Sequence, residues 1–600
     1  MIRIVMDDGI ILTLLIRCAL FKRKLSGANI ANHLKTAVEV EMGLDMAYCK
    51  AVICDRASTN KLALKELNRL FPDVHIVPFF CWSHTLSNAG KQMMGFDNAP
   101  YIESFRKIWQ KIIQFKGSKA RELAKEKIGA SVKEAGGVRF YVHYEQITQI
   151  ADYGMEKILE EILPTCIDNK WSELSSQKLL HKFGNDQGKA ELAMAILEGG
   201  AIADSGKSFC QGCYTLEGDS PLIFAAAEVI KRINTDLDAN VEMPRVDAVL
   251  SRVLDLLTEA HDYVANVKEL HKEAVDDATR IAEENKVKVK DAKTVRDDIR
   301  GVRRGNRANA RQRVANPNFV DQEALTNAIV MIAEANADLR LSQQNLEEAQ
   351  KAFDKNNRVY QEWLTKFPFE NERELKAHAT SLRNAGTDYF RNQFLTRDGD
   401  LYAAKKVADC CATLFNPLWL EGKAGDLEFV RSKVELLQYF DFKEFSDEFM
   451  QNIRIEIEGV VDRATHSNFD WDGIDSSRLF KTRMQKRKKR AAANADIVDE
   501  DWRKDAGELA TRIWEWWRPI IVDGGKFPYF SKALRLIGLI QVSSCAVERV
   551  FSALQRIREL CGDQMLEDML EVRMHARING NEQINCLLLR AYEHPLEDVP

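Results

Sequence analysis

The strongest constraint on the fold is a pair of heptad repeats in the middle of the chain. One repeat alternates steps of three and four residues and is interrupted only at His271: Val246, Leu250, Val253, Leu257, Ala260, Val264, Val267, Ala274, Ala278 and Ile281. The other places a large apolar residue at every seventh position, with alanines between: Leu325, Ile332, Leu339, Leu346, Phe353 and Tyr360, with Ala328, Ala335 and Ala349. Such repeats are typical of helices that pack along a coiled-coil seam.

The segment between the two repeats predicts how they are connected. It is polar and contains Gly301, Gly305 and Pro317, which disfavour a continuous helix. We therefore expect an antiparallel coiled-coil hairpin over residues 246–365. Its first arm, of about 55 residues, would reach roughly 80 Å at 1.5 Å per residue.

The N-terminal part of the chain follows a different pattern, in which short apolar runs alternate with helical segments. Strands are expected at 2–6 and 10–18, joined by the turn Asp7-Asp8-Gly9. A helix follows from Ser26 to about Met46. Two further strands, at 51–55 and 74–80, are each followed by a helix. This order predicts an α/β fold with a mixed sheet.

Length and composition indicate a globular chain with several regions. Its 600 residues exceed the roughly 250–300 that one hydrophobic core usually supports. The balance of 85 Lys+Arg against 90 Asp+Glu provides no overall positive field for nucleic acid. The 12 cysteines are irregularly spaced, which favours reduced thiols in an intracellular protein. The apolar run from Ile10 to Ile16 is too short to span a bilayer, so we expect no membrane partner.

Positive charge is nevertheless concentrated in two places. Six arginines crowd the expected hairpin tip: Arg300, Arg303, Arg304, Arg307, Arg311 and Arg313. They would either bind DNA phosphates or form a solvated loop between acidic helices. The second cluster, at residues 481–490, places seven basic residues in ten, and an acidic stretch follows at 496–501. It resembles a nuclear localisation signal or a phosphate-binding linker, and we expect a nuclear protein.

Some residues could carry chemistry. Asp55 ends a predicted buried strand, where a carboxylate can hold a metal ion or cap the next helix. By periodicity alone, Glu548 would form a solvated pair with its neighbour on a helix surface. Cys81-x-x-His84 has zinc-ligand spacing, but no second pair stands nearby, and nothing in the sequence joins Cys210-x-x-Cys213 to it. We expect Cys81 and His84 to support the Asp55 site through hydrogen bonds.

Taken together, these segments resemble the hAT superfamily of DNA transposases and the cellular proteins descended from them. AVICDRASTN (51–60) is similar to the strand that bears the family's second catalytic Asp, and FFCWSHTLSNAG (79–90) to its Cys-x-x-His element. Residues 514–558 contain a Trp pair, a Phe-Pro and Ser-Ser-x-x-x-Glu-Arg-x-Phe-Ser. They are similar to the family's C-terminal block, which holds the third catalytic carboxylate and much of the dimerisation surface.

The resemblance implies a fold of the α/β plus α class, in which a ribonuclease H-like mixed sheet is interrupted by a large all-helical insertion. The implied regions are a first part of the ribonuclease H-like core at 1–95, helical insertions at 96–245 and 366–480, the coiled-coil hairpin at 246–365, a basic and acidic linker at 481–501, and a C-terminal dimerisation region at 502–600 that completes the core. The first strand of the sheet is expected to be missing.

The resemblance also implies roles for single residues. Asp55 and Glu548 become the expected catalytic residues and metal ligands. In the family, carboxylates hold divalent ions such as Mg²⁺ or Mn²⁺, which activate water and then a DNA 3′-hydroxyl for in-line attack. Arg139 and Phe140 align with an Arg-Trp that the family uses near a flipped base. Dimer contacts are expected at Trp514, Trp516, Trp517 and Phe551.

We expect catalysis to be impaired. The given sequence begins with the first hairpin strand, so we expect the preceding strand with the first catalytic Asp, and an N-terminal zinc finger, to be missing. The expected function is that of a hAT transposase-like homodimer with DNA as a possible partner. Two alternatives stay open: an active transposase whose N-terminus is missing from the gene model, and a non-enzymatic coiled-coil scaffold.

Overall fold

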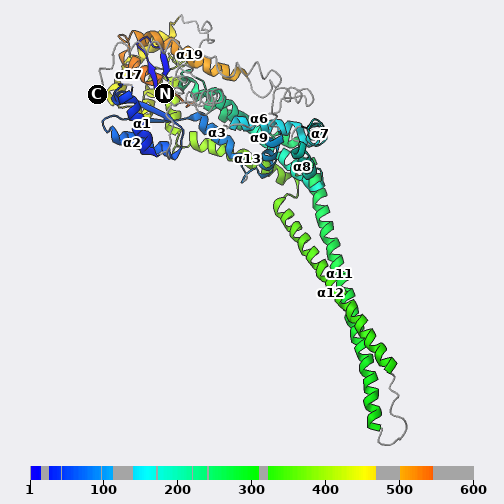
Figure 1. The fold of residues 1–600 in the computed structure, drawn as a ribbon. Helices are drawn as coiled ribbons and strands as arrows, with labels where there is room; N and C mark the ends of the chain where they lie inside the picture. The colour runs from blue at the N-terminus through cyan, green and yellow to red at the C-terminus, as the bar shows by residue number, and fades with distance from the viewer. Residues whose placement is uncertain are drawn as a thin grey trace. The chain divides into compact units, whose positions relative to one another are not determined.

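The chain is mainly helical and divides into two compact units (Figure 1). The computed structural model describes residues 2–14, 26–41, 43–95, 97–112, 140–170, 173–218, 220–239, 242–309, 322–467 and 500–544. The first unit draws on Met1–Gln177, Ala195–Asp247 and His378–Pro600, and the second on Lys178–Met194 and Ala248–Ala377. The first unit is therefore assembled from segments that lie far apart in the sequence.

The first unit begins with the predicted β-hairpin. Strands β1 (Ile2–Val5) and β2 (Ile11–Leu14) pair in antiparallel register, with Ile2 opposite Leu14. Gly9 has φ +75°, which the tight turn requires and a side chain would disfavour. The turn is held by Trp514 Nε1, which donates to Gly9 O at 2.9 Å. The hairpin therefore packs on the C-terminal helices.

A second small sheet follows the first helices. Strands β3 (Ala51–Cys54) and β4 (Val77–Phe80) pair in parallel, with Ala51 opposite Val77. Helix α1 (Gly27–Lys35) precedes this pair, α2 (Ser58–Leu70) connects its strands, and α3 (Trp82–Gln92) follows. A core of Ala31, Met46, Leu67 and Ile76 includes residues of α1 and α2, and Val52 of β3 packs against it.

The expected mixed sheet is not present among the described residues. They contain two separate two-stranded sheets, β1–β2 and β3–β4, so the prediction of one ribonuclease H-like sheet is corrected. The physical reason lies in the hydrogen bonds. The β1–β2 hairpin is anchored to C-terminal helices, for instance by Arg3 Nε, which donates to Gly538 O at 2.8 Å, while the ladder of β3 is formed with β4. Alternation of strands and helices predicts the elements but not their partners.

The remainder of the first unit is helical, with aromatic packing at its centre. Trp517 stacks on Phe530 at a centroid distance of 5.8 Å and meets Phe415 edge-on at 6.3 Å. The helices of the two units outside the long hairpin are α4 (Pro100–Ile112), α6 (Phe140–Glu156), α7 (Leu163–Asp168), α8 (Glu173–Phe183), α9 (Asp186–Leu216), α10 (Ile223–Ala239), α13 (Glu372–Phe394), α14 (Tyr402–Thr413), α15 (Pro417–Glu421), α16 (Leu427–Ser432), α17 (Asp447–Thr465), α19 (Glu500–Val522) and α20 (Pro528–Gly538). Short π-helical or 3₁₀ segments lie at Thr36–Glu41, Met46–Tyr48, Lys157–Ile162 and Lys433–Phe440.

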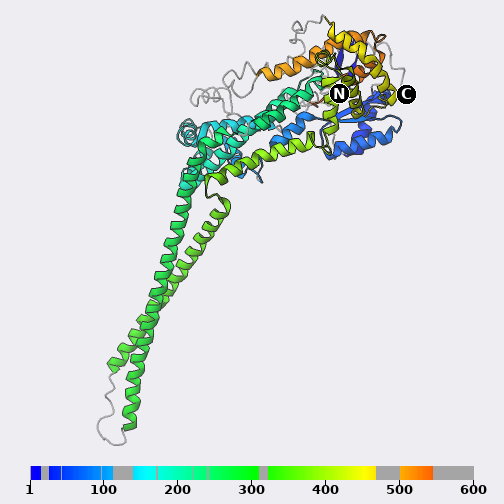
Figure 2. The ribbon, with the colours of Figure 1, turned by 180° about the vertical axis from the view of Figure 1, so that it is seen from behind.

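The heptad repeats lie on two long helices of the second unit. Helix α11 (Pro244–Asn309) has 66 residues and α12 (Gln322–Lys366) has 45. They run side by side in both views of the molecule (Figures 1 and 2). Early residues of α11 meet late residues of α12, since the ring of His261 packs on that of Tyr360. Farther along, Asn285 Nδ2 donates to Asp338 O at 3.4 Å, so the two helices are antiparallel.

Helix α11 continues beyond the predicted break. It passes through Gly301 and Gly305 and ends at Asn309, which makes it longer than the expected arm. A glycine costs a helix only about 1 kcal/mol relative to alanine, so two glycines among good helix formers do not end it. The prediction of a loop from residue 301 is therefore wrong.

The buried seam follows the predicted heptads on α12 but shifts on α11. Ala328 is buried, and Leu339 and Leu346 are half-buried, as predicted. On α11, Ile281 is 44% exposed whereas Ala282, one position later, is buried. A straight helix drifts by about 20° per heptad against a 3.5-residue repeat, and five heptads turn it by about one residue.

No helix within the described part of the chain combines the length and the hydropathy needed to cross a membrane.

Candidate functional site

The candidate site lies where the two parallel strands end. Asp55 directly follows β3 and is half-buried. Its Oδ1 accepts hydrogen bonds from Ala57 N at 2.9 Å and from Asn60 Nδ2 at 2.7 Å. These bonds stabilise the first turn of α2, where the Ala57 cap position has no side-chain bond of its own. One carboxylate oxygen of Asp55 thus already accepts two hydrogen bonds from the start of α2.

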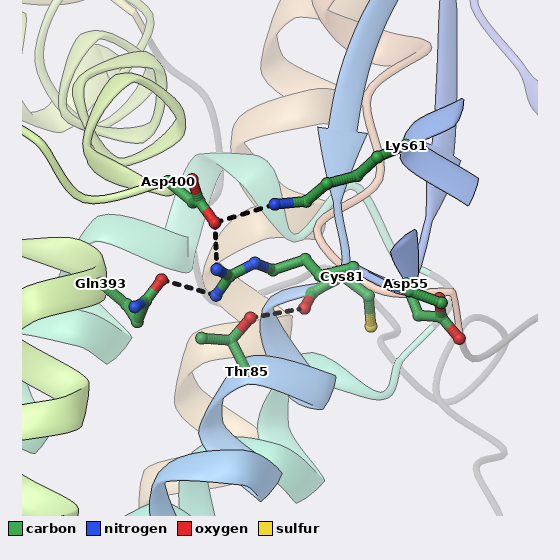
Figure 3. Close-up of polar contacts among 8 residues, drawn as sticks. Asp55, Lys61, Cys81, Thr85, Gln393 and Asp400 are labelled. Atoms are coloured by element: carbon green, nitrogen blue, oxygen red, sulfur yellow. Dashed lines mark hydrogen bonds and ion pairs between the residues drawn. The ribbon is translucent and has the colours of Figure 1, made fainter. Parts of the chain in front are cut away.

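A cluster of charged residues lies beside Asp55, on the other side of the loop. Arg56 Nη1 donates to Gln393 Oε1 at 2.5 Å, and its Nη2 forms an ion pair with Asp400. Lys61 Nζ lies 3.2 Å from the same Asp400 oxygen. Figure 3 shows Asp55 directed away from Gln393 and Asp400. The cluster therefore anchors the loop after β3, and the Asp55 side chain lies on the opposite side of that loop.

The charge of Asp400 is stabilised by its partners. Partial burial alone would raise the pKa of Asp400, but the hydrogen bond from Lys61 and the positive charges of Arg56 and Lys61 outweigh it. The net result is a pKa below the usual range of an aspartate, so this carboxylate is ionised at neutral pH. Its role here is to hold Arg56 and Lys61.

Cys81 joins three parts of the site. Its backbone N donates to Cys54 O at 2.9 Å, at the end of β3. Its Sγ accepts from His84 N at 3.4 Å, at the start of α3, and from Ser544 N at 3.3 Å. The side chain is buried, and Thr85 Oγ1 also donates to Cys81 O (Figure 3). These bonds join Cys81 to the end of β3, to α3 and to Ser544, and its expected support of Asp55 stays a prediction.

The two cysteine-containing motifs lie close together but do not form a metal centre. Cys213 Sγ donates to Ser83 O at 3.3 Å, between Cys81 and His84. The described residues nevertheless contain no group of three or more histidine, cysteine or acidic side chains that could hold a metal ion. Burial raises the pKa of the nearby Cys54 to about 12, so this thiol stays neutral at physiological pH.

The C-terminal segment reaches the same strand ends. Trp82 N donates to Val542 O at 2.8 Å. The neighbouring residue Cys81 contacts Ser544, two positions farther along the same C-terminal segment. Ser544 is buried and is the last residue of the described chain. The segment before the expected catalytic Glu548 is thus brought to the edge that carries Asp55, although Glu548 itself lies outside the described residues.

These contacts allow a test of the donor set for a divalent ion. Asp55 contributes one carboxylate, with one of its oxygens already bonded to Ala57 and Asn60. Divalent cations in phosphoryl-transfer sites need several oxygen ligands. The residues of the described chain do not fit such an ion by themselves, because Asp55 is not part of any group of three or more histidine, cysteine or acidic side chains there.

The expected base-contacting pair falls elsewhere. Arg139 lies outside the described residues, and Phe140 opens α6 with a fully buried ring. Phe140 N donates to Ser87 Oγ at 2.9 Å, and a Cβ added at Gly90 would lie 2.3 Å from the Phe140 ring. Phe140 is therefore a core residue whose ring packs against Gly90, in the space that a side chain at Gly90 would occupy. In this fold its ring is not exposed to a ligand, and its expected contact with DNA stays an untested prediction.

The tip arginines are only partly described. Arg300 is exposed on α11, and the backbone at Arg303, Arg304 and Arg307 continues the same helix. Arg311 and Arg313, like the basic cluster at 481–490, lie outside the described residues. The described arginines thus follow a helical register, in contrast to the loop that the sequence predicts.

The tryptophans expected at the dimer surface belong to the core of a single chain. Trp514, Trp516 and Trp517 are all buried. Trp516 Nε1 donates to Ser467 Oγ at 3.0 Å and Trp517 Nε1 to Phe415 O at 2.9 Å. The three side chains are thus covered within one chain, and their expected role in dimer contacts stays a prediction. Phe551 lies outside the described residues.

Sequence reasoning missed the partners of Arg56. A charged residue near the end of a strand is a weak signal for a polar site, and Arg56, two residues after β3, is such a residue. Gln393 and Asp400 show no such signal in the sequence, because they lie on a helix end and a turn more than three hundred residues away from Arg56. Only the packing of α13 near the strand ends brings them together.

Comparison with known proteins finds one match. Residues 493–570 match the model of the hAT family C-terminal dimerisation region. No curated protein and no solved structure matches the chain. The match covers the described residues 500–544 and the segment that follows them.

Proposed function

We propose that this chain is a hAT transposase-related protein that self-associates through its C-terminal region. The match of residues 493–570 to the hAT dimerisation region carries this proposal. Helices α19 and α20 in this region are largely buried within one chain. The contact between copies is therefore assigned to the later part of the match, where Phe551 lies.

The edge at Asp55 is proposed to be the remnant of a phosphodiester-processing site. The path from Cys54 through Cys81 to Ser544 supports a role for Asp55 together with Glu548, four residues farther on. Transposase chemistry depends on several carboxylates acting together, and losing one costs on the order of 10³-fold in rate. Since the described residues contain no group of three or more such ligands, we assign no cleavage step and propose a chain that is catalytically impaired.

Self-association can be tested with one charged substitution. Phe551→Glu would place a carboxylate in the proposed interface, and burying it there is costly. We expect the dimer to become a monomer in light scattering, with the helical content preserved. The matched control is Ile455→Glu, because Ile455 is 67% exposed on α17 and lies outside the matched region. A Phe551→Glu chain that remains dimeric would refute the assigned interface.

DNA binding and cleavage can be tested on the same preparation. We propose that the arginines Arg300, Arg303, Arg304, Arg307, Arg311 and Arg313 bind DNA phosphates, and that binding weakens as salt is raised. Replacing all six by glutamine should abolish the gel shift. We expect no strand cleavage with Mg²⁺ or Mn²⁺. Cleavage that Asp55→Ala abolishes would establish an active enzyme instead, whereas absence of any DNA shift would favour the scaffold alternative.

A further inference from the structure

An exposed face of α11 carries two opposite sets of charges. Acidic residues recur every seven positions in the first part of the helix, at Asp262, Glu269, Asp276 and Glu283. Basic residues recur in the same way afterwards, at Lys286, Lys293, Arg300 and Arg307. The side chains from Asp262 to Arg300 in these sets are exposed, and Arg307 follows in register. A seven-residue spacing keeps each set on one side of the helix.

The two sets are symmetric about one point. Outward from the bond between Glu284 and Asn285, each acidic residue has a basic counterpart at the same distance on the other side. The resulting pairs are Glu283 with Lys286, Asp276 with Lys293, Glu269 with Arg300, and Asp262 with Arg307. Each pair joins opposite charges.

The exceptions to the pattern obey the same symmetry. Lys272 is a basic residue on this face of the acidic half, and Asp297 is an acidic residue on this face of the basic half. They lie at equal distances from the symmetry point and so match each other. At the border of the face, Glu273 matches Arg296 in the same way. Between Asp262 and Arg307, no matched pair on α11 joins two like charges.

This symmetry is what an antiparallel pair of identical helices requires. In such a pair, a two-fold axis places each residue opposite the one equally far from the axis on the partner helix, and every contact occurs twice. Complementary charges at these positions set the partner and the direction of helices. A parallel pair in register would instead place each charged residue beside its own copy, and like charges repel.

We propose that α11 associates with α11 of a second copy of this chain, antiparallel, with the two-fold axis between Glu284 and Asn285. The local ion pairs on the face then become part of a network. Lys272 Nζ lies 2.7 Å from Glu269, and Arg296 lies 2.8 Å from Asp297. In the proposed arrangement Lys272 of one local pair faces Asp297 of the other, and charge networks stabilise more than isolated exposed pairs do.

Charge complementarity favours a second copy over DNA on this face as a whole. Arg300 and Arg307 at its end also belong to the arginines proposed to bind DNA, so a second copy and DNA would compete for these two residues. The basic half alone could contact phosphates, but Asp262, Glu269, Asp276 and Glu283 would repel a duplex that continued along the helix. Binding to DNA also gives no reason for Asp297 to match Lys272. This surface is separate from the proposed C-terminal interface, so either could fail without the other.

The test is a charge exchange in the full-length protein. One variant carries Glu269→Lys and Asp276→Lys, and a second carries Lys293→Glu and Arg300→Glu. Each places like charges opposite each other in two of the proposed pairs. A third variant combines all four substitutions, which keeps the net charge of the native chain and restores opposite charges in every pair.

The association of these proteins is followed by sedimentation velocity at low and high salt. The native chain should form species larger than the C-terminal dimer at low salt and lose them at high salt, because exposed charges are screened. Each double variant should weaken this association by about tenfold or more. The fourfold variant should recover it, and so should an equal mixture of the two double variants.

A control separates this surface from a general effect of charge. Asp277 and Asp291 are exposed on a different side of α11, and each is matched to an alanine by the symmetry. Asp277→Lys with Asp291→Lys should leave association unchanged. The proposal is overturned if the native chain forms no species beyond the dimer, or if the fourfold variant does not recover association. Loss of a DNA shift in the fourfold variant without recovered association would assign the face to nucleic acid.

Discussion

At the scale of single residues, the candidate site is held together by bonds between distant parts of the chain. Asp55 bonds locally to Ala57 and Asn60, which the strand-to-helix pattern predicts. Cys81 bonds to Ser544 across 463 positions, and Arg56 to Asp400 across 344. Local patterns therefore identify the loop, and tertiary contacts decide which side chains surround it.

The ion pair of Asp400 should make stability depend on pH. The pKa of Asp400 is lower in the folded chain than the usual 3.8, so its stabilising effect is present above that pH and is lost as pH falls through the folded value. Asp400→Asn should reduce the free energy of unfolding at pH 7 by about 1 kcal/mol or less, because the side chain is 41% exposed and solvent screens the pair.

Urea unfolding at several pH values measures this difference. The gap between the native chain and Asp400→Asn should close below about pH 3.8. Asp398→Asn is the matched control, since Asp398 is exposed nearby, and it should show no gap at any pH. A gap for Asp400→Asn that is equally large at pH 3 and pH 7 would contradict the ion pair.

At the scale of elements, the long helices show both the strength and the limit of periodicity. The heptads of α12 predict its buried side because the large apolar residues that recur every seven positions, from Leu325 to Tyr360, are all half-buried, whereas apolar residues in other phases, such as Met331 and Leu341, are exposed. On α11 the apolar residues fit two neighbouring stripes along the helix. The stripe with Ala282, Val289 and Ala292 is the buried one, and only contact with α12 decides this. Helical drift moves this stripe by one residue, which a fixed repeat cannot show.

A buried asparagine in this seam should cost stability. Asn285 is 8% exposed, and its Nδ2 bonds to Asp338 O at a long 3.4 Å. Polar residues in a coiled-coil seam fix the register and reduce stability. Asn285→Val should therefore raise the free energy of unfolding by about 1 kcal/mol, since the helix propensities of the two residues are similar. The measurement is thermal unfolding followed by circular dichroism.

The exposed Asn266 provides the control for this prediction. Asn266→Val replaces the same residue type on the surface of α11 and should change stability by a few tenths of a kcal/mol at most. If Asn285→Val instead lowers the free energy of unfolding, the prediction is wrong. The hydrogen bond of Asn285 would then stabilise the chain by more than its burial costs.

At the scale of the whole molecule, the chain forms two compact units, each with buried aromatic side chains. The first unit gathers three stretches of sequence around aromatic packing near Trp517, and the second contains the long hairpin with Trp363 buried at its base. Trp363 packs on Phe367 at a ring distance of 4.2 Å. Units with their own cores can unfold independently, in contrast to a single two-state domain.

Two tryptophan substitutions test this independence. Trp517→Ala and Trp363→Ala each remove a buried aromatic side chain and should cost about 3–5 kcal/mol in the unit that contains it. In differential scanning calorimetry, each should lower one transition and leave the other in place. A single transition that both substitutions lower equally would show that the units unfold together.

The sequence by itself determined the local elements: the first hairpin, the strand before Asp55, the cysteine that begins α3, and two long helices with heptad repeats. These follow from periodicity and turn chemistry, which act over a few residues. Only the tertiary structure decided that the strands form two small sheets, that Phe140 and the three tryptophans are core residues, and that Ser544 bonds to Cys81. Pairing and burial depend on which distant segments pack together, and that choice is made by the free energy of the whole fold.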